Sequence, residues 1–190
     1  LKGEESSLMM LPTYLKSQGA ITKNQKVLVL DMGGTNLRTA VVELGETGSQ
    51  ISYFKKCPMP GTQGPMEKDE FFKAIARQLL PVVDRSDRLG VCFSYAAELQ
   101  PNRDGIALEV SKGLQVRGLK GVSVCEEINR ALEKLAPGQR KKAVMLNDTV
   151  ATMLGGRQEK EYSGYVGFVL GTGTNTCYTE RGANITKLPA

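Results

Sequence analysis

Two glycine-rich turns, one near each end of the chain, constrain the fold more than any other sequence feature. In residues 27–42, a short aliphatic run leads through Asp31-Met32-Gly33-Gly34-Thr35-Asn36 into a second apolar run. In residues 166–178, another apolar run leads through Leu170-Gly171-Thr172-Gly173-Thr174-Asn175 into a strand-like segment. Short aliphatic runs of this kind are typical of buried strands. Each segment therefore predicts a β-hairpin with glycines at its tip.

The residues at both tips are those of an anion-binding turn. We expect Gly33 and Gly34 to adopt positive φ and to bring the backbone close to a ligand. Thr35, Asn36 and nearby backbone N–H groups would then form a concavity that suits a phosphate. The glycine spacing is not that of a dinucleotide-binding loop, and no Gly-Lys-Ser/Thr sequence follows as in a Walker loop. A lone glycine hairpin is most often only a turn, but two that face each other could hold a polyphosphate between two lobes.

Between the hairpins, the hydrophobic pattern predicts an α/β unit. The expected strands cover 26–32, 36–44, 50–56, 89–95 and 143–146, and the expected helices cover 68–85, 122–135 and 149–154. This βββαβαβα order describes a lobe with a mixed sheet, after which the second hairpin begins another lobe. We therefore expect one domain over 1–156 and the start of a second over 157–190. A helix is also expected within the first 25 residues, and the proline and glycine segment 58–65 predicts a hinge or linker.

Polar side chains follow several of the predicted strands. They lie from Asp31 to Arg38, at Ser94, at Asn147-Asp148 and from Gly171 to Asn175. Because the carboxyl ends of strands share one edge in an open α/β sheet, we expect these groups to meet. Asp148 is the best catalytic candidate, since a carboxylate there could accept the proton of a hydroxyl that attacks phosphorus. Asp148 could instead only cap the following helix, and the Ser111-Lys112-Gly113 stretch could be an ordinary surface turn.

Composition disfavours several other classes of function. The net charge of +5 is modest and its positive residues are scattered, which disfavours nucleic-acid binding. The chain has no histidine, and its cysteines at 57, 92, 125 and 177 lack metal-ligand spacing, which disfavours zinc and a histidine base. Cys92 and Cys177 lie in apolar strand patterns and are expected to be buried thiols, as in a reducing compartment. No signal peptide or membrane-spanning run is apparent, so we expect a cytoplasmic protein without membrane partners.

In chain order, the motifs resemble those of the hexokinase family of the actin-like ATPase superfamily. LDMGGTNLR resembles the family's first phosphate motif, LNDTVATMLGG its Asn-Asp-Thr-Val-Ala segment, and GFVLGTGTNTCYTE its second phosphate motif. CFSYAAELQ and VSKGL are similar to the sugar-contacting Phe-Ser-Phe-Pro and Trp-Thr-Lys-Gly-Phe segments, and SLMMLPTYL to a Met-Leu-Pro-Thr segment. The departures are Tyr95, Ala96, Val110 and Ser111, and they concern sugar preference more than reaction type.

The resemblance implies an actin-like (RNase H-like) lobe that takes part in the ATP-dependent phosphorylation of a hexose, with glucose expected. The reaction is the first step of glycolysis, and Asp148 would take the proton from the sugar's 6-hydroxyl. The sugar would be held by Ser94, Ser111, Lys112, Asn147, Asp148 and Asn175. The phosphates would be lined by Gly33, Gly34, Thr35, Asn36, Gly171, Thr172 and Gly173. Asp31 would lie near Mg²⁺ through water, while Arg38 would contact phosphate or form a structural ion pair.

The resemblance also implies a longer enzyme. Members of this family are more than twice as long, and their later sugar-binding glutamates and adenosine pocket have no counterpart in the 190 residues. We therefore expect a fragment, or a second chain that supplies the carboxyl-terminal half. Two other classes remain open. One is a non-catalytic sugar-binding or sugar-sensing module of the same fold. The other is an actin-like filament former, which would not need the sugar-contacting segments.

The missing adenosine pocket leads to a first prediction. We expect the purified 190-residue chain to show little or no ATP-dependent phosphorylation of glucose, because half of the expected nucleotide site would be absent. A coupled assay on the homogeneous chain measures this directly. Turnover at rates typical of enzymes, ~1–1000 per second, would contradict the prediction.

Overall fold

A computed structural model describes residues 10–15, 22–46, 48–108, 113–156, 164–171 and 173–185. Its helices and strands alternate much as the sequence predicts. In chain order they are β1 (Gln25–Met32), β2 (Asn36–Leu44), β3 (Ser49–Pro58), β4 (Met66–Glu67), α1 (Lys68–Leu79), the 3₁₀ helix η1 (Leu80–Arg85), β5 (Arg88–Phe93), β6 (Ala97–Leu99), β7 (Gly105–Ala107), β8 (Val116–Arg117), α2 (Val124–Leu135), β9 (Lys142–Leu146), α3 (Asp148–Gly156), β10 (Val166–Leu170), β11 (Thr174–Tyr178) and the 3₁₀ helix η2 (Gly182–Asn184).

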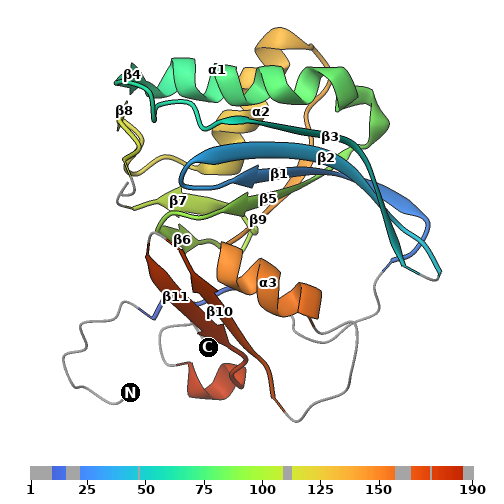
Figure 1. The fold of residues 1–190 in the computed structure, drawn as a ribbon, viewed down its shortest axis with the longest axis vertical. Helices are drawn as coiled ribbons and strands as arrows, with labels where there is room; N and C mark the ends of the chain where they lie inside the picture. Colours follow the sequence, from blue (N-terminus) through green and yellow to red (C-terminus); the bar gives the residue numbers. More distant parts are fainter. Residues whose placement is uncertain are drawn as a thin grey trace.

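A five-stranded mixed sheet in the order β3-β2-β1-β5-β9 forms the centre of the fold (Figure 1). The first three strands pair antiparallel, β1 with β2 and β2 with β3. The last three pair in parallel, β1 with β5 and β5 with β9. The predicted mixed sheet is therefore confirmed. Its parallel half places the carboxyl ends of β1, β5 and β9 at one edge.

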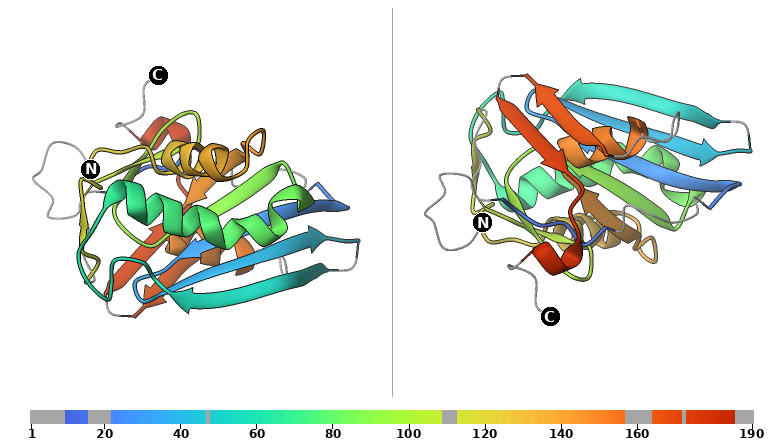
Figure 2. Two further views of the ribbon diagram at one scale, coloured as in Figure 1. Left: turned by 90° about the horizontal axis from the view of Figure 1, so that it is seen from above. Right: turned by 90° about the horizontal axis from the view of Figure 1, so that it is seen from below.

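The two faces of the sheet are covered differently. Helices α1 and α2 lie on one face, whereas α3 and the β10–β11 hairpin lie on the other (Figures 1 and 2). On β1, Leu28, Leu30 and Met32 are fully buried and belong to the same core cluster as the apolar residues of α1 and α2. Burial of each such side chain contributes roughly 1.5–3 kcal/mol. The alternate residues of β1, including Asp31, are only half-buried, so the period of two along the strand separates the core from the polar face.

The predicted helix over 68–85 is divided in two by Pro81. Helix α1 buries Phe72, Ile75 and Leu79 on one stripe and ends at Leu79. The 3₁₀ helix η1 follows directly, because a proline has no N–H to continue the α-helical hydrogen-bond ladder.

None of the helices in the described segments is long and apolar enough to cross a membrane.

Helix α2 is capped by a side chain from a different part of the chain. Asp104, in the turn between β6 and β7, is only 7% exposed. Its carboxylate accepts the backbone N–H groups of Cys125 (2.8 Å) and Glu126 (3.1 Å), together with the hydroxyl of Ser123. These N–H groups have no partner within the helix, so Asp104 satisfies them in place of a local cap.

Two local predictions are wrong. Residues 10–15 have no regular structure where a helix was expected, with Pro12 at their centre; the rest of that predicted helix lies outside the described residues. The segment 58–65 is not a linker. Met59 is 1% exposed in the core, and its N–H donates to the oxygen of Thr35 (2.9 Å). The oxygen of Gly61 accepts the N–H of Gln115 (2.8 Å), so this segment is fixed at Met59 and at Gly61.

The second glycine-rich segment forms the predicted hairpin. β10 and β11 pair antiparallel, with Val166 opposite Tyr178 and Leu170 opposite Thr174. They form a separate two-stranded sheet and contact α3 instead of extending the central sheet. The division into domains at 156–157 stays a prediction.

Asp104 generates a prediction about stability. Substitution of Asp104 by alanine leaves buried N–H groups of α2 without an acceptor, so we expect it to lower the free energy of unfolding by about 2–3 kcal/mol. Urea unfolding monitored by circular dichroism measures the change. Asp84→Ala is the matched control, because the side chain of Asp84 is 73% exposed and its ion pair with Arg85, at 3.7 Å, lies at the surface. Equal losses in the two variants would contradict the capping role of Asp104.

Candidate functional site

The ends of the three parallel strands are joined by hydrogen bonds at the polar edge of the sheet. The N–H of Ser94, just after β5, donates to the oxygen of Met32 at the end of β1 (3.2 Å). The side-chain amide of Asn147, just after β9, donates to the oxygen of Phe93 at the end of β5 (3.3 Å). The sequence-predicted meeting of polar groups at this edge is therefore observed for Ser94 and Asn147.

The first glycine turn is held by close backbone contacts. The N–H of Gly33 donates to the oxygen of Asn36 (3.0 Å), and a Cβ at Gly33 would lie 3.1 Å from the same oxygen. The φ angles of Gly33 and Gly34 are not positive, so the expectation of a left-handed backbone is wrong for both residues. Gly33 is required because the two sides of the turn approach closely, which leaves little room for a side chain.

Asp31 and Arg38 form an ion pair across β1 and β2. They are directly opposite in the strand register, and Nη1 of Arg38 lies 2.6 Å from Oδ2 of Asp31. Both side chains are about one-third exposed, at 30% and 39%, so solvent screening limits the contribution to stability to about 0–1 kcal/mol. The ion pair instead fixes the direction of the Asp31 carboxylate. Of the two predicted roles of Arg38, the ion pair is observed and the phosphate contact stays a prediction.

Cys92 lies opposite Asp31 in the parallel pair of β1 and β5. Burial raises the pKa of the Cys92 thiol to about 12, and the neighbouring carboxylates of Asp31 and Asp148 add to the effect. Cys92 is therefore a neutral thiol that can donate to Asp31. It is half-buried, as is Cys177, so the expectation of buried thiols is wrong for both. Asp31 lies at the carboxyl end of β1 and Asp148 follows β9 by two residues, so both carboxylates lie at the same edge of the sheet.

Asn147 and Asp148 begin helix α3. Oδ1 of Asn147 accepts the N–H (3.1 Å) and the hydroxyl (2.7 Å) of Thr149. Oδ1 of Asp148 accepts the same N–H at 2.9 Å. Asn147 is therefore the capping residue, since its backbone oxygen also accepts the first helical bond, from the N–H of Ala151 (2.9 Å). The interpretation of Asp148 as the cap is wrong: Asp148 is the first residue of the helix. Thr149, which is 1% exposed, was not predicted from the sequence. Its position could have indicated the contact, because it carries a hydroxyl two residues after an Asn at the start of a helix.

The second hairpin reaches this site through Asn175. Its side-chain amide donates to Oδ1 of Asn147 (2.9 Å). The hairpin can lie this close because Gly167 of β10 has no side chain: a Cβ there would lie 2.4 Å from the oxygen of Thr149 and 2.9 Å from Cβ of Met153. The turn between β1 and β2 and the tip of β10–β11 lie at the same end of the molecule (Figures 1 and 2).

Some sequence-predicted residues cannot be placed. Ser111, Lys112 and Thr172 lie outside the described residues, so their contacts stay predictions. Leu108, the last described residue before Ser111, lies beside Ala96, because its N–H donates to the oxygen of Ala96 (3.0 Å). Within the second turn, the N–H of Gly171 donates to the oxygen of Gly173 (3.0 Å) and closes the tip.

The donor set fits an indirectly held Mg²⁺. Within the described segments, no three His, Cys, Asp or Glu side chains are grouped so that they could hold a metal ion by themselves. Mg²⁺ typically keeps several waters and binds through one or two carboxylates and the phosphates of a substrate. Asp31 alone therefore suits a contact through water and does not suit a metal site built only by protein.

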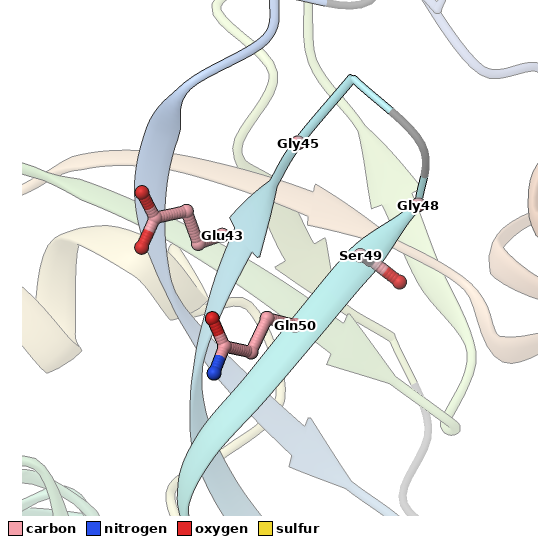
Figure 3. A pocket seen from close by; sticks show the side chains of 5 residues that line it. All are labelled: Glu43, Gly45, Gly48, Ser49 and Gln50. Atoms are coloured by element: carbon pink, nitrogen blue, oxygen red, sulfur yellow. The ribbon is translucent and has the colours of Figure 1, made fainter.

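A surface hollow lies away from this site. It has a volume of about 420 Å³ and is lined by residues on both sides of the turn between β2 and β3 (Figure 3). Its lining residues are Glu43, Gly45, Gly48, Ser49 and Gln50. It lies at the opposite end of β2 from Asn36 and the first glycine turn, so it is not part of the candidate site.

Comparison with known proteins decides the family. The family model described as hexokinase matches residues 1–158. The chain belongs to the hexokinase family. It is 31% identical to hexokinase-3 of Mus musculus over the whole of this chain and 21% of that protein. It is 33% identical to the chloroplastic hexokinase-2 of Nicotiana tabacum, over 97% of this chain and 39% of that protein. This hexokinase chain thus spans about a fifth to two fifths of the length of these relatives.

The fold agrees with that assignment. A solved hexokinase from Schistosoma mansoni, complexed with glucose, superposes with a TM-score of 0.83 at 28% identity. The match covers 95% of this chain and 42% of that chain. The resemblance to the hexokinase family and the actin-like α/β fold class expected from the motifs are both confirmed.

The close approach of Gly167 generates a second structural prediction. In Gly167→Ala, the new methyl group would collide with the backbone of α3, which cannot move aside easily. We expect the hairpin to separate from α3 and the free energy of unfolding to fall by about 1–3 kcal/mol. Amide hydrogen exchange of β10 and β11 measures the separation. Gly164→Ala is the control, because a Cβ at Gly164 meets nothing within 4 Å; unchanged protection in Gly167→Ala would contradict the packing argument.

Proposed function

We propose that the protein to which this hexokinase chain belongs transfers the γ-phosphoryl group of ATP to the 6-hydroxyl of a hexose, with glucose as the first candidate. Membership of the family supports this, as does the glucose bound to the related Schistosoma mansoni hexokinase. The single observation that carries the proposal is the hydrogen bond from Asn175 to Asn147. It joins the second glycine hairpin to the strand end that holds Asp148.

In this proposal Asp148 is the catalytic base. Its carboxylate is half-buried and is held at the first position of α3 by the N–H of Thr149. A carboxylate there can accept the proton of the sugar hydroxyl as the hydroxyl oxygen attacks phosphorus. Ser94, Asn147 and Asn175 would hydrogen-bond to the other hydroxyls of the sugar, and by resemblance Ser111 and Lys112 would do so from the segment after Leu108.

The two glycine turns would hold the phosphates. The backbone N–H groups of Gly34, Thr35 and Asn36 would face the nucleotide from one side, and those of Thr172 and Gly173 from the other. Gly33 and Gly171 would line the phosphates without donating to them, because their N–H groups are bonded within their own turns. Asp31 would hold Mg²⁺ through water, and the ion would neutralise negative charge on the phosphates. The ion pair with Arg38 keeps the Asp31 carboxylate directed for this role. Closure of lobes around 58–65 is not part of the proposal, because that segment is anchored in the core.

We further propose that the chain is the amino-terminal part of a longer enzyme that carries out the first step of glycolysis. The lengths of its relatives support this proposal: the chain covers 21% of the mouse hexokinase-3 and 39% of the tobacco hexokinase-2. The carboxyl-terminal remainder would supply the adenosine pocket. The cytoplasmic location expected from the sequence stays a prediction.

The role of Asp148 is tested in the longer protein with Asp148→Asn. The amide keeps the shape and the contact with Thr149 but cannot accept the proton. We therefore expect kcat to fall about 10²- to 10⁴-fold while the dissociation constant for glucose, measured by calorimetry, changes little. Asp69→Asn is the matched control, since Asp69 also lies in the first turn of a helix, with its side chain 74% exposed.

Three outcomes would count against the proposal. Loss of glucose binding in the same proportion as kcat would exclude the base role of Asp148. Glucose binding without phosphorylation in the unaltered protein would favour the sugar-sensing alternative. Nucleotide-dependent sedimentation without sugar binding would favour the filament former.

A further inference from the structure

Tyr95 makes a contact that its place in the sugar-contacting segment does not explain. Its hydroxyl donates to the backbone oxygen of Gly33 (3.2 Å), in the first glycine turn. The side chain is only 2% exposed, and its ring lies 5.2 Å from the ring of Phe93 at a tilted angle. Burial raises the pKa of Tyr95 to about 12, so the hydroxyl keeps its proton and can donate at physiological pH.

The peptide that Tyr95 contacts is one that could otherwise rotate. It joins Gly33 to Gly34, and neither residue has a side chain to restrict the backbone. The N–H of Gly33 is fixed by the oxygen of Asn36 (3.0 Å), but this bond leaves the following peptide plane free. The hydroxyl of Tyr95 therefore supplies the restraint on the orientation of the Gly33 carbonyl.

The planarity of the peptide bond carries this restraint to Gly34. In a trans peptide, the C=O of one residue and the N–H of the next point in opposite directions, and no described peptide bond is cis. Because Tyr95 holds the oxygen of Gly33 toward the buried side of the turn, the N–H of Gly34 is directed away from Tyr95. That direction leads from the core toward the tip of the turn, where Thr35 is exposed.

We propose that Tyr95 is a positioning residue for the anion site: its hydroxyl orients the Gly33–Gly34 peptide so that the N–H of Gly34 can donate to a phosphate oxygen. The inference rests on the proposed function, because it takes the ligand of this turn to be a polyphosphate. A preoriented donor binds without first losing conformational freedom. The Phe-Ser-Phe-Pro pattern that this segment resembles has a phenylalanine at the position of Tyr95, and a phenylalanine cannot supply this hydrogen bond.

The competing explanation is that Tyr95 only fills the core. Tyr95→Phe separates the two explanations, because it keeps the ring beside Phe93 and removes only the hydroxyl. Tyr53→Phe is the matched control. Tyr53 is 54% exposed on β3, and its ring contacts Arg85 (4.9 Å), a contact that phenylalanine can keep.

The test uses the ¹⁵N-labelled 190-residue chain with inorganic tripolyphosphate as the probe. We expect the amide signal of Gly34 to shift as the probe is added to the unaltered chain. In Tyr95→Phe, the dissociation constant should rise about three- to tenfold, the change that loss of one intramolecular hydrogen bond produces. The Gly34 signal should also differ from that of the unaltered chain before any probe is added, whereas Tyr53→Phe should match the unaltered chain in both measurements.

Two results would overturn the inference. An unchanged dissociation constant in Tyr95→Phe would show that the hydroxyl does not orient the donor. A Gly34 signal that ignores tripolyphosphate in the unaltered chain would show that this N–H does not face the anion. Failure of the longer protein to phosphorylate a hexose would remove the proposed function, but a Tyr95-dependent response of Gly34 would still stand, so the two failures are distinguishable.

Discussion

The side-chain oxygen of Asn147 is the acceptor on which the arrangement of this site depends. It receives the N–H and hydroxyl of Thr149 and the amide of Asn175, while the amide of Asn147 itself donates to Phe93. One side chain thus joins the end of β5, the start of α3 and the second glycine hairpin. Because hydrogen bonds in such a network polarise one another and share groups, removal of one member affects the others.

Side chains alternate along the strands of the sheet, so that one face packs in the core and the other carries the polar groups of the candidate site. On β1, one face supplies Leu28, Leu30 and Met32 to the core, and the other presents Asp31 beside Cys92. The polar face is covered more loosely, by α3 and a hairpin whose outer side exposes Phe168 and Leu170. The buried face of the sheet therefore supplies the core, and the other face carries the polar groups of the candidate site.

Sequence reasoning was most successful where a local pattern and a general topological rule agreed. The aliphatic runs before Asp31 and Asn147 are strands of the central sheet, and their polar ends meet because parallel strands share one edge. The second of them, β9, is an edge strand in which only Met145 is buried. Sequence reasoning was wrong for segment 58–65, whose prolines and glycines suggest a linker although Met59 lies in the core. It was also wrong for the φ of Gly33, because the requirement for glycine there comes from the oxygen of Asn36 across the turn. Both errors concern contacts between residues that a local pattern does not relate.

The sequence by itself determined the mixed sheet, the two glycine hairpins and the family to which the motifs point, since each depends on short-range periodicity or on residues adjacent in the chain. Only the tertiary structure decided that Asp104 caps α2, that Gly167 lets β10 approach α3, and that Tyr95 contacts Gly33. Tyr95 and Gly33 are 62 positions apart in the chain. Their contact exists because β1 and β5 pair in parallel, and side-chain direction at the ends of paired strands is set by packing that no single segment encodes.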